Sequence, residues 1–378
     1  MSWRKEKLSN ICHMKTGKLD SNAAVPDGEF PFFTCAQETY RINIAAYDTE
    51  AVLLGGNNAA GIFPLKYYNG PFNAYQRTYI LESLDSSKLS TRFLYYALKP
   101  ALSLFQSASI GAATQYLTKP ILENFQISLP SIESQNKIVS ILSVYDDLIE
   151  NNRRRIQLLE EAARLLYQEW FVRLRFPGHE HAKIVDGVPE GWDQQQIRSI
   201  CPEIRTGVDP ASLDPKTPYI GLEHIPRRSI SLSSWSNVEE VNSRKYRYQE
   251  GDILFGKIRP YFHKVGIAFN SGVTSSDSII LRPISFLYHP FLLMMVSSDG
   301  FVSEVSKTMK EGTKMPRADW KFIEQKKISI PPDPLLSAFN TYIEPIISQL
   351  KTLSLCNIQL QEARDLLLPR LMNGVIPV

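Results

Sequence analysis

The chain has 378 residues, of which 43% are hydrophobic and 21% charged, a composition typical of folded domains and not of disordered chains. Its formal net charge is +3, from 42 basic and 39 acidic residues, so the protein is not a polycation and any nucleic-acid binding must use local basic patches. The length allows two or three domains.

The four cysteines are isolated from one another along the chain, at Cys12, Cys35, Cys201 and Cys356. This spacing excludes a CxxC metal or redox motif and favours a reducing cytosol over a disulfide framework. The charged opening MSWRKEKLSN has no apolar region behind it, so we expect no signal peptide, and the apolar runs are far too short for a membrane span. We therefore expect a cytoplasmic protein that uses no membrane.

A first globule of mixed strands and helices is predicted at the start of the chain. The run AVLLGG (51–56) has the pattern of a buried strand, and TRFLYYALKP (91–100) has that of a short helix. The stretch GGNNAAG (55–61) lacks the glycine spacing and the Gly-Lys-Ser/Thr ending of phosphate-binding loops. A turn beside a strand is therefore favoured over a cofactor loop.

A long helix is predicted next. Apolar side chains recur in alternating steps of four and three from Ile138 to Trp170, which forms a heptad seam of more than four repeats. Asn152 lies on this seam, where a polar residue costs stability and commonly fixes the register or orientation of a partner helix. A helix from about Ser134 to Phe171, at ~1.5 Å per residue, is roughly 55 Å long.

Three consecutive arginines follow the seam asparagine. Glu150 lies three and four residues before Arg153 and Arg154, so we expect both to pair with it within the helix. Arg155 has no acid at these spacings and is the most available to another molecule. Because residues 131–176 contain seven basic and seven acidic residues, a DNA-binding strip is disfavoured, which leaves a solvated face or a partner-docking face.

The second globule repeats the first. The segment GTKMPRADWKFIEQKKISIP (312–331) aligns with GAATQYLTKPILENFQISLP (111–130) at an offset of 201 residues, and each globule begins just after a tryptophan, Trp3 or Trp192. Short runs such as YIGL and SIILRPI predict strands. Strands and helices alternate without a βαβ rhythm, which favours an α+β fold over a doubly wound sheet.

Two patterns in this part of the chain resemble metal sites. The EQK segment (324–326) with Asp319 fits half of a nuclease motif, but both carboxylates lie in one local segment and not on adjacent strands, which favours a solvated charged face. The HEH segment (179–181) signals no third ligand, and Pro177 before it predicts a turn. We predict no metal site.

The same seam recurs near the end of the chain. A shift of 201 residues carries it to a series from Phe339 to Leu371, with Asn357 as a polar member. Pro345 interrupts this pattern, so the second helix is predicted to kink or to start there.

Four segments of the sequence together resemble those of a known protein family. LPSIESQNKIVSIL, DDLIENNRRRIQLLEEAARLLYQEWFVRLRFPGHE, VPEGW and LLLPRLMNGVI together resemble the specificity subunit of type I restriction–modification systems. The resemblance is strongest in the helical regions and covers the whole chain in plan. The second helix departs from the pattern, because PPDPLLSAF lacks the glutamine that follows SLPSIES in the first.

This resemblance implies an α+β fold with an internal pseudo-two-fold repeat. Two target-recognition domains (1–130 and 177–331) would be separated by two spacer helices (131–176 and 332–378) packed as an antiparallel coiled coil. A strut of this length exceeds one DNA turn of ~34–36 Å, so it can set the two domains a turn or more apart. Two similar but diverged domains predict an asymmetric, bipartite site with an unread spacer.

The resemblance also implies function and partners. The chain would be a non-catalytic subunit that recognises double-stranded DNA and docks two modification (methyltransferase) subunits, which restriction (motor-nuclease) subunits join. It implies no cofactor in this chain, S-adenosylmethionine in the methyltransferase, and ATP and Mg²⁺ in the restriction subunit.

Candidate contacts follow from side-chain chemistry, because phosphates bind Lys and Arg while base edges also bind Asn and Gln. A solvated loop residue is the alternative for each one, and packing against the sheet is the alternative for the tyrosine. The DNA-contact predictions are Asn57, Asn58, Lys66, Tyr68, Gln76, Arg77 and Gln115 in the first globule, and Lys257, Arg259, His263, Ser276, Lys314 and Arg317 in the second. The partner-contact predictions on the helices are Arg155, Tyr167, Trp170, Arg364 and Arg370.

Three other functions stay open. The chain could be a free-standing DNA-binding scaffold that serves a different nuclease or methyltransferase, or a DNA-modifying enzyme with an undetected active site. The sequence has no Asn/Asp-Pro-Pro-aromatic quartet of the kind that positions the amine in adenine methyltransferases, which disfavours the enzyme. A purely structural coiled coil would not explain two loop-rich globules.

Overall fold

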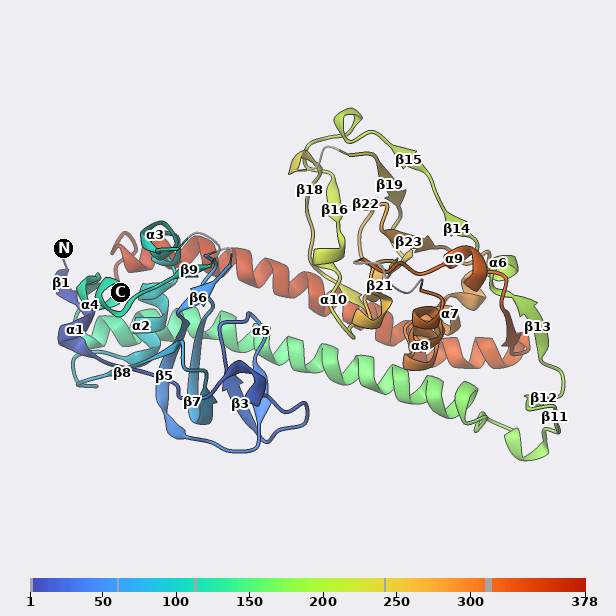
Figure 1. The fold of residues 1–378 in the computed structure, drawn as a ribbon, viewed down its shortest axis with the longest axis horizontal. Coiled ribbons are helices and arrows are strands. Elements are labelled where there is room, and N and C mark those ends of the chain that lie inside the picture. The colour runs from blue at the N-terminus through green and yellow to red at the C-terminus, as the bar shows by residue number, and fades with distance from the viewer. Residues whose placement is uncertain (1–2, 60, 112–113, 241–242, 310–314) are drawn as a thin grey trace. The chain divides into compact units, whose positions relative to one another are not determined.

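The computed structural model describes residues 3–59, 61–111, 114–240, 243–309 and 315–378 (Figure 1). The chain forms two compact units, Met1–Asp147 with Leu360–Val378, and Leu148–Gln359. We call these unit 1 and unit 2. Two long helices, α5 (Ile132–Tyr167) and α10 (Asp333–Met372), each contribute to both units. In the described ranges, no helix is long and apolar enough to cross a bilayer.

Unit 1 is built on a six-stranded sheet with the order β2-β8-β5-β7-β3-β4. The β3–β7 pair is parallel and the other pairs of this sheet are antiparallel. Helix α2 packs against β5 and buries Phe93 and Leu94 in the main core of this unit. The elements are β2 (Cys12–Thr16), β3 (Phe30–Phe33), β4 (Tyr40–Ile42), β5 (Tyr47–Gly55), β7 (Leu65–Ala74), β8 (Thr78–Ser83), α2 (Thr91–Leu98) and α3 (Leu102–Ala108).

Unit 2 contains two five-stranded sheets, with the orders β14-β23-β20-β21-β17 and β15-β19-β22-β16-β18. Helix α7 (His289–Val296) is buried over its whole length, and α8 (Asp299–Lys307) follows it. The strands of the first sheet are β14 (Glu203–Ile204), β17 (Ser231–Leu232), β20 (Ile253–Gly256), β21 (Val265–Ala268) and β23 (Ser278–Leu281). Those of the second are β15 (Gly207–Val208), β16 (Pro218–Ile220), β18 (Ser236–Asn237), β19 (Lys245–Tyr248) and β22 (Gly272–Thr274).

The internal repeat is visible in the hydrogen bonds of the two units. Leu117 N donates to Gly56 O at 2.9 Å, and 201 residues later Ala318 N donates to Lys257 O at 2.9 Å. The strands that lead into the long helices show the same shift, and each pairs with a strand near the start of its own globule. These strands are β1 (Arg4–Lys7) with β10 (Gln126–Leu129), and β13 (Asp193–Gln196) with β24 (Lys327–Ile330). The predicted α+β class is confirmed.

The two long helices pack antiparallel along the predicted seams. In unit 2, Asn152 Nδ2 donates to Asn357 Oδ1 at 3.0 Å, and the rings of Trp170 and Phe339 lie 5.7 Å apart. Residue numbers on α10 therefore fall as those on α5 rise. Every predicted seam residue of both helices is buried or half-buried, so the seam is confirmed.

Of the two alternatives predicted at Pro345, a kink or a start of the second helix, the start is wrong. Helix α10 begins at Asp333 and continues for 40 residues through Pro345. The proline removes one helix hydrogen bond, but the fully buried side chains of Ile343 and Leu350 on either side hold the helix in place. The first helix ends at Tyr167, and a π-helical turn covers Gln168–Val172.

Candidate nucleic-acid interface

In unit 1, polar residues from three separate segments meet beyond the end of β5. The short strand β6 (Asn57–Asn58) pairs with β9 (Gln115–Tyr116), with Asn57 opposite Tyr116. The Arg77 carbonyl accepts a bond from Gly56 N at 2.7 Å, and its guanidinium lies 5.2 Å from the centre of the Tyr116 ring. We call Asn57, Asn58, Arg77, Gln115 and Tyr116 the first cluster.

The first cluster offers both hydrogen-bonding groups and a cation. The Gln115 amide is held in place, since its Nε2 donates to Gly111 O at 2.8 Å and its Oε1 accepts from Ser109 Oγ at 3.0 Å. Asn57 Oδ1 is buried without a partner among the described residues, and the Arg77 side chain is exposed. Amides and a guanidinium are the groups that bind base edges and phosphates. Sequence reasoning missed Tyr116, whose only signal was its position next to Gln115.

Three other predicted contacts of unit 1 are held by their own unit. Lys66 Nζ donates to Ala36 O, Glu38 O and Thr39 Oγ1 at 3.2, 2.8 and 3.1 Å, and burial lowers its pKa to about 8. These three acceptors use all of its ammonium donors.

Tyr68 and Gln76 also contact residues of their own unit. The Tyr68 ring packs 5.4 Å from Phe33, and Gln76 Nε2 donates to Asp20 Oδ1 at 2.8 Å. DNA contact by Lys66, Tyr68 and Gln76 stays a prediction, and these internal contacts weigh against it.

In unit 2, a second group gathers around Asp277. Lys257 N donates to Asp277 O at 2.8 Å, and Arg317 Nη2 lies 3.1 Å from Asp277 Oδ1. Arg259 N donates to Pro316 O at 2.9 Å, which brings the two arginine-bearing segments together. Ser276 is exposed beside them. We call Lys257, Arg259, Ser276 and Arg317 the second cluster.

The two clusters occupy equivalent positions in the repeat. A bridge between Ile258 and Arg317 in unit 2 matches the pair of Asn57 and Tyr116 in unit 1, with both residues shifted by 201. The side chains differ in kind, because the first cluster is rich in amides and the second in cations. Equivalent loops with different side chains have the arrangement expected of two sites that contact different ligand sequences.

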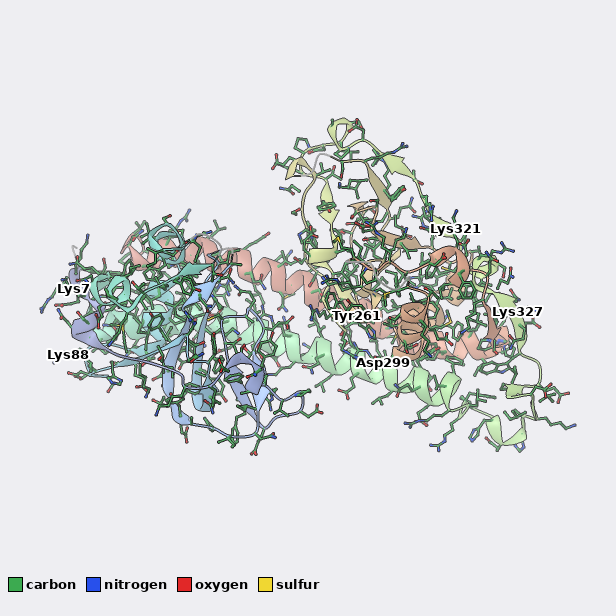
Figure 2. All side chains as sticks on the ribbon, viewed as in Figure 1. Lys7, Lys88, Tyr261, Asp299, Lys321 and Lys327 are labelled. Atoms are coloured by element: carbon green, nitrogen blue, oxygen red, sulfur yellow. The ribbon has the colours of Figure 1, made fainter. Side chains whose placement is uncertain are left out.

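His263 and Lys314 are not placed on this surface. His263 is 7% exposed, with Nε2 at 2.7 Å from Ser297 O and Nδ1 at 3.3 Å from Asp299 Oδ1. Burial lowers its pKa, and its partner Asp299 lies at the start of α8 (Figure 2). The DNA contact predicted for His263 needs an exposed side chain, so its burial weighs against it. Lys314 lies outside the described residues.

The predicted partner residues fall into two groups. Tyr167 and Trp170 are 8% and 7% exposed and belong to the core of unit 2. Arg364 pairs with Asp146 at 2.6 Å. Docking by these three stays a prediction that their internal contacts weigh against, whereas Arg155 and Arg370 are exposed.

The arginine pairing follows the prediction. Arg153 and Arg154 lie 3.9 and 3.3 Å from the Glu150 carboxylate. Within the described part of the chain, Arg155 has neither a hydrogen bond nor an ion pair.

Arg155 lies on a second, exposed heptad series of α5 that sequence reasoning missed. Leu148, Leu158 and Leu165 are 44%, 65% and 51% exposed, which is high for leucine. We call Leu148, Asn151, Arg155, Leu158, Ala162 and Leu165 the outer stripe, and all six are exposed at steps of three and four. The signal was present in the sequence as a second set of leucines beside the seam.

The EQK segment and Asp319, which resembled part of a metal site in the sequence, have structural roles. Asp319 caps α9 (Trp320–Ile323) by accepting from Phe322 N at 3.3 Å, and Lys326 pairs with Glu304. In the residues that the structure describes, no three His, Cys, Asp or Glu side chains gather as a metal site requires.

Comparisons with known proteins show which proteins this chain is similar to. Residues 2–161 match the sequence family described as "Type I restriction modification DNA specificity domain". The chain is 29% identical over 363 residues to the type I restriction enzyme EcoDI specificity subunit of Escherichia coli, covering 88% of this chain and 79% of the relative. The chain is therefore similar, over most of its length, to specificity subunits of type I restriction–modification systems.

Other specificity subunits agree. Identity is 25% over 305 residues with the MjaIX specificity subunit of Methanocaldococcus jannaschii, covering 76% of this chain and 69% of the relative. The fold matches the crystal structure of the S subunit of a type I system from M. genitalium, with a TM-score of 0.58, 16% identity, and coverage of 98% and 96%. The similarity to specificity subunits thus rests on sequence, and the shared fold on structure.

Proposed function

We propose that this chain is a specificity subunit that recognises a bipartite, asymmetric DNA target, with the first cluster contacting one half and the second cluster the other. The observation that supports this is the pair of equivalent bridges with different side chains, Asn57 with Tyr116 and Ile258 with Arg317. Two identical surfaces would favour a palindromic target. Different surfaces on one chain favour two unlike half-sites.

We assign no catalytic step to this chain. Its clusters offer groups that bind bases and phosphates, and methyl transfer, with S-adenosylmethionine, belongs to modification subunits. ATP and Mg²⁺ would be used by a restriction subunit. Incubation of the isolated chain with S-adenosylmethionine and duplex DNA tests this division, since methyl transfer without a partner would contradict it.

We also propose that the outer stripe docks one of two modification subunits. Apolar residues at heptad steps fit the apolar face of a partner helix. Arg155, at the middle of the stripe and without an internal ion pair among the described residues, is placed to bind an acidic side chain of that helix.

The DNA contact of the first cluster is tested by Arg77→Ala. The change should weaken binding of duplex target by about tenfold and lower the salt dependence, because one phosphate or base contact is lost. Fluorescence anisotropy at several salt concentrations, with the assembled complex, measures both quantities.

Lys88→Ala is the matched control, since Lys88 is an exposed cation of the same unit that pairs with Asp85 (Figure 2). Equal effects of the two substitutions would show that Arg77 contributes only general charge. Unchanged affinity in Arg77→Ala would remove it from the interface.

A further inference from the structure

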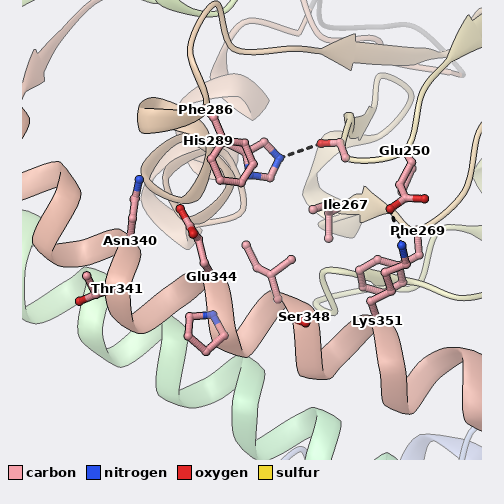
Figure 3. Close-up of a pocket in the computed structure, with 14 residues that line it drawn as sticks. Glu250, Ile267, Phe269, Phe286, His289, Asn340, Thr341, Glu344, Ser348 and Lys351 are labelled. Carbon is pink, nitrogen blue, oxygen red and sulfur yellow. Dashed lines mark hydrogen bonds and ion pairs between the residues drawn. The ribbon is translucent and has the colours of Figure 1, made fainter.

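A cavity of about 580 Å³ opens in unit 2 between α10, the turn before β20 and the start of α7 (Figure 3). Its lining is largely apolar, with Ile267, Phe269 and Phe286 among its side chains. None of the residues of the two clusters or of the outer stripe lines it. The volume lies within the range of small-molecule sites, and the proposed DNA recognition gives this cavity no role.

Two buried acceptors at this cavity lack partners. His289 is 7% exposed, and its Nε2 lies 2.7 Å from the Gly251 carbonyl, so Nε2 carries the proton and Nδ1 is an acceptor in the neutral ring. Asn340 is 6% exposed, and its Nδ2 donates to Leu287 O at 3.0 Å. Among the described residues, neither His289 Nδ1 nor Asn340 Oδ1 receives a hydrogen bond. Buried polar atoms in this state are uncommon in folded proteins.

Pro345 adds a third acceptor at the same place. It has no N–H, so the carbonyl of Thr341, one turn earlier on α10, does not receive the usual helix hydrogen bond from residue 345. Both residues line the cavity. Because of the proline, the Thr341 carbonyl is available to accept a hydrogen bond from a ligand.

The cavity carries a negative charge. Lys351 is paired with Glu250, which leaves the carboxylate of Glu344 without an ion pair in the described residues. Figure 3 shows Glu344 on the stretch of α10 that faces His289. The cavity thus combines unsatisfied acceptors, one uncompensated negative charge and an apolar lining.

We propose that this cavity binds an organic cation, an amidinium or guanidinium group carried on an apolar body. The N–H groups of such a cation would donate to His289, Asn340 and the Thr341 carbonyl, while Glu344 balances its charge. The apolar body would cover Ile267 and Phe269. The cation can come from a free small molecule or from an arginine side chain of a partner protein, and neither source depends on the proposed DNA recognition.

Benzamidine is the probe for this chemistry, with neutral benzamide as its matched control. Isothermal calorimetry on the full chain should show benzamidine binding at least about tenfold more tightly than benzamide, as expected for a charge-assisted contact. Equal binding of the two compounds, or no binding of benzamidine, would overturn the proposal.

Two pairs of variants locate the site. Glu344→Gln should weaken benzamidine binding about tenfold, whereas Glu362→Gln, an exposed glutamate of the same helix, should not. Ser348→Phe should block the cavity, whereas Gln349→Phe, its exposed neighbour outside the cavity, should leave binding unchanged. Binding that survives in Glu344→Gln and Ser348→Phe would place the probe elsewhere and contradict the proposal.

Binding measurements on the assembled complex distinguish the two sources of the cation. If a partner arginine fills the cavity, benzamidine binding is lost in the complex and Ser348→Phe weakens assembly. If the ligand is a free small molecule, benzamidine binds the complex as well and assembly is unchanged. DNA affinity, measured on the same samples, reports on the proposed function separately.

Discussion

Glu160 links α5 to a sheet of unit 2 through one buried carboxylate. Its Oε1 accepts from Ser229 Oγ at 2.7 Å, Ile230 N at 3.0 Å, and Ser231 N and Oγ at 3.1 and 2.7 Å. Its Oε2 lies 3.4 Å from Arg164 Nη2. An acceptor in this position fixes the start of β17 on the helix, so the packing of this sheet against α5 depends on one side chain.

Glu160→Ala should lower the free energy of unfolding of unit 2 by about 3 kcal/mol, because several buried donors lose their acceptor at once. Urea denaturation measures the loss. Glu161→Ala, an exposed neighbour on the same helix, should change stability by less than about 0.5 kcal/mol. A small effect at Glu160 would show that the donors find other acceptors.

Lys66 and His263 show which residue-scale features a sequence does not reveal. A lysine among polar residues and a histidine near arginines have the chemistry of DNA contacts, and nothing local in the sequence distinguishes them from exposed residues. Lys66 is half-buried because residues 36–39 fold over it, and His263 is buried because α8 and Ser297 cover it. Both are long-range contacts that leave no periodic pattern in the chain.

At the scale of elements, the helix pair carries one polar contact in an apolar seam. Asn152 and Asn357 are each 7% exposed and hydrogen-bond to one another. The bond is satisfied only when these two residues lie opposite each other, so it selects one register of the antiparallel pair at some cost in stability.

A double-mutant cycle tests this pairing. Asn152→Leu alone should cost about 1–2 kcal/mol of unfolding free energy, because it leaves the Asn357 amide buried and unpaired. The double variant with Asn357→Leu should recover that loss, giving a coupling energy of about 1–3 kcal/mol in urea denaturation. Additive single effects would mean that the two amides do not act as a pair.

The outer stripe makes a prediction about assembly. Leu158→Asp should leave the stability of the chain within about 0.5 kcal/mol, since this side chain is 65% exposed. It should weaken binding of a modification subunit by about tenfold or more, as expected for an apolar anchor at an interface. Analytical ultracentrifugation of the mixture measures the affinity.

Gln157→Asp is the control, because Gln157 is exposed on α5 next to the stripe and not on it. If both substitutions weaken assembly equally, added negative charge explains the effect. If neither does, the modification subunits dock elsewhere.

The long helices were predictable because regular burial leaves a regular pattern. The seam from Ile138 to Trp170 and its copy 201 residues later required no tertiary information, and the pairing of Arg153 and Arg154 with Glu150 follows from helix geometry. The sequence did not decide whether the second helix starts at Pro345 or continues through it, because this depends on the packing on both sides of the proline. The bridges that assemble the two clusters also depend on contacts between distant segments.

At the scale of the whole molecule, the chain contains the same main-chain arrangement twice, with different side chains at the two clusters. The main-chain bonds at Gly56 and at Lys257 are the same, while the residues presented beside them change from amides to cations. In the proposed function, the shared framework with different loops gives each unit its own half-site. We therefore expect that substitutions in the cluster of one unit alter recognition of one half of the target.

Methylome sequencing of cells that carry this chain with its modification subunits tests that claim most directly. We predict a single asymmetric motif of two short specific parts around an unspecific spacer, absent when the chain is absent. Substitutions in the first cluster, such as Arg77→Ala with Gln115→Ala, should relax one part and leave the other unchanged. A continuous or palindromic motif, or loss of specificity in both parts at once, would contradict it.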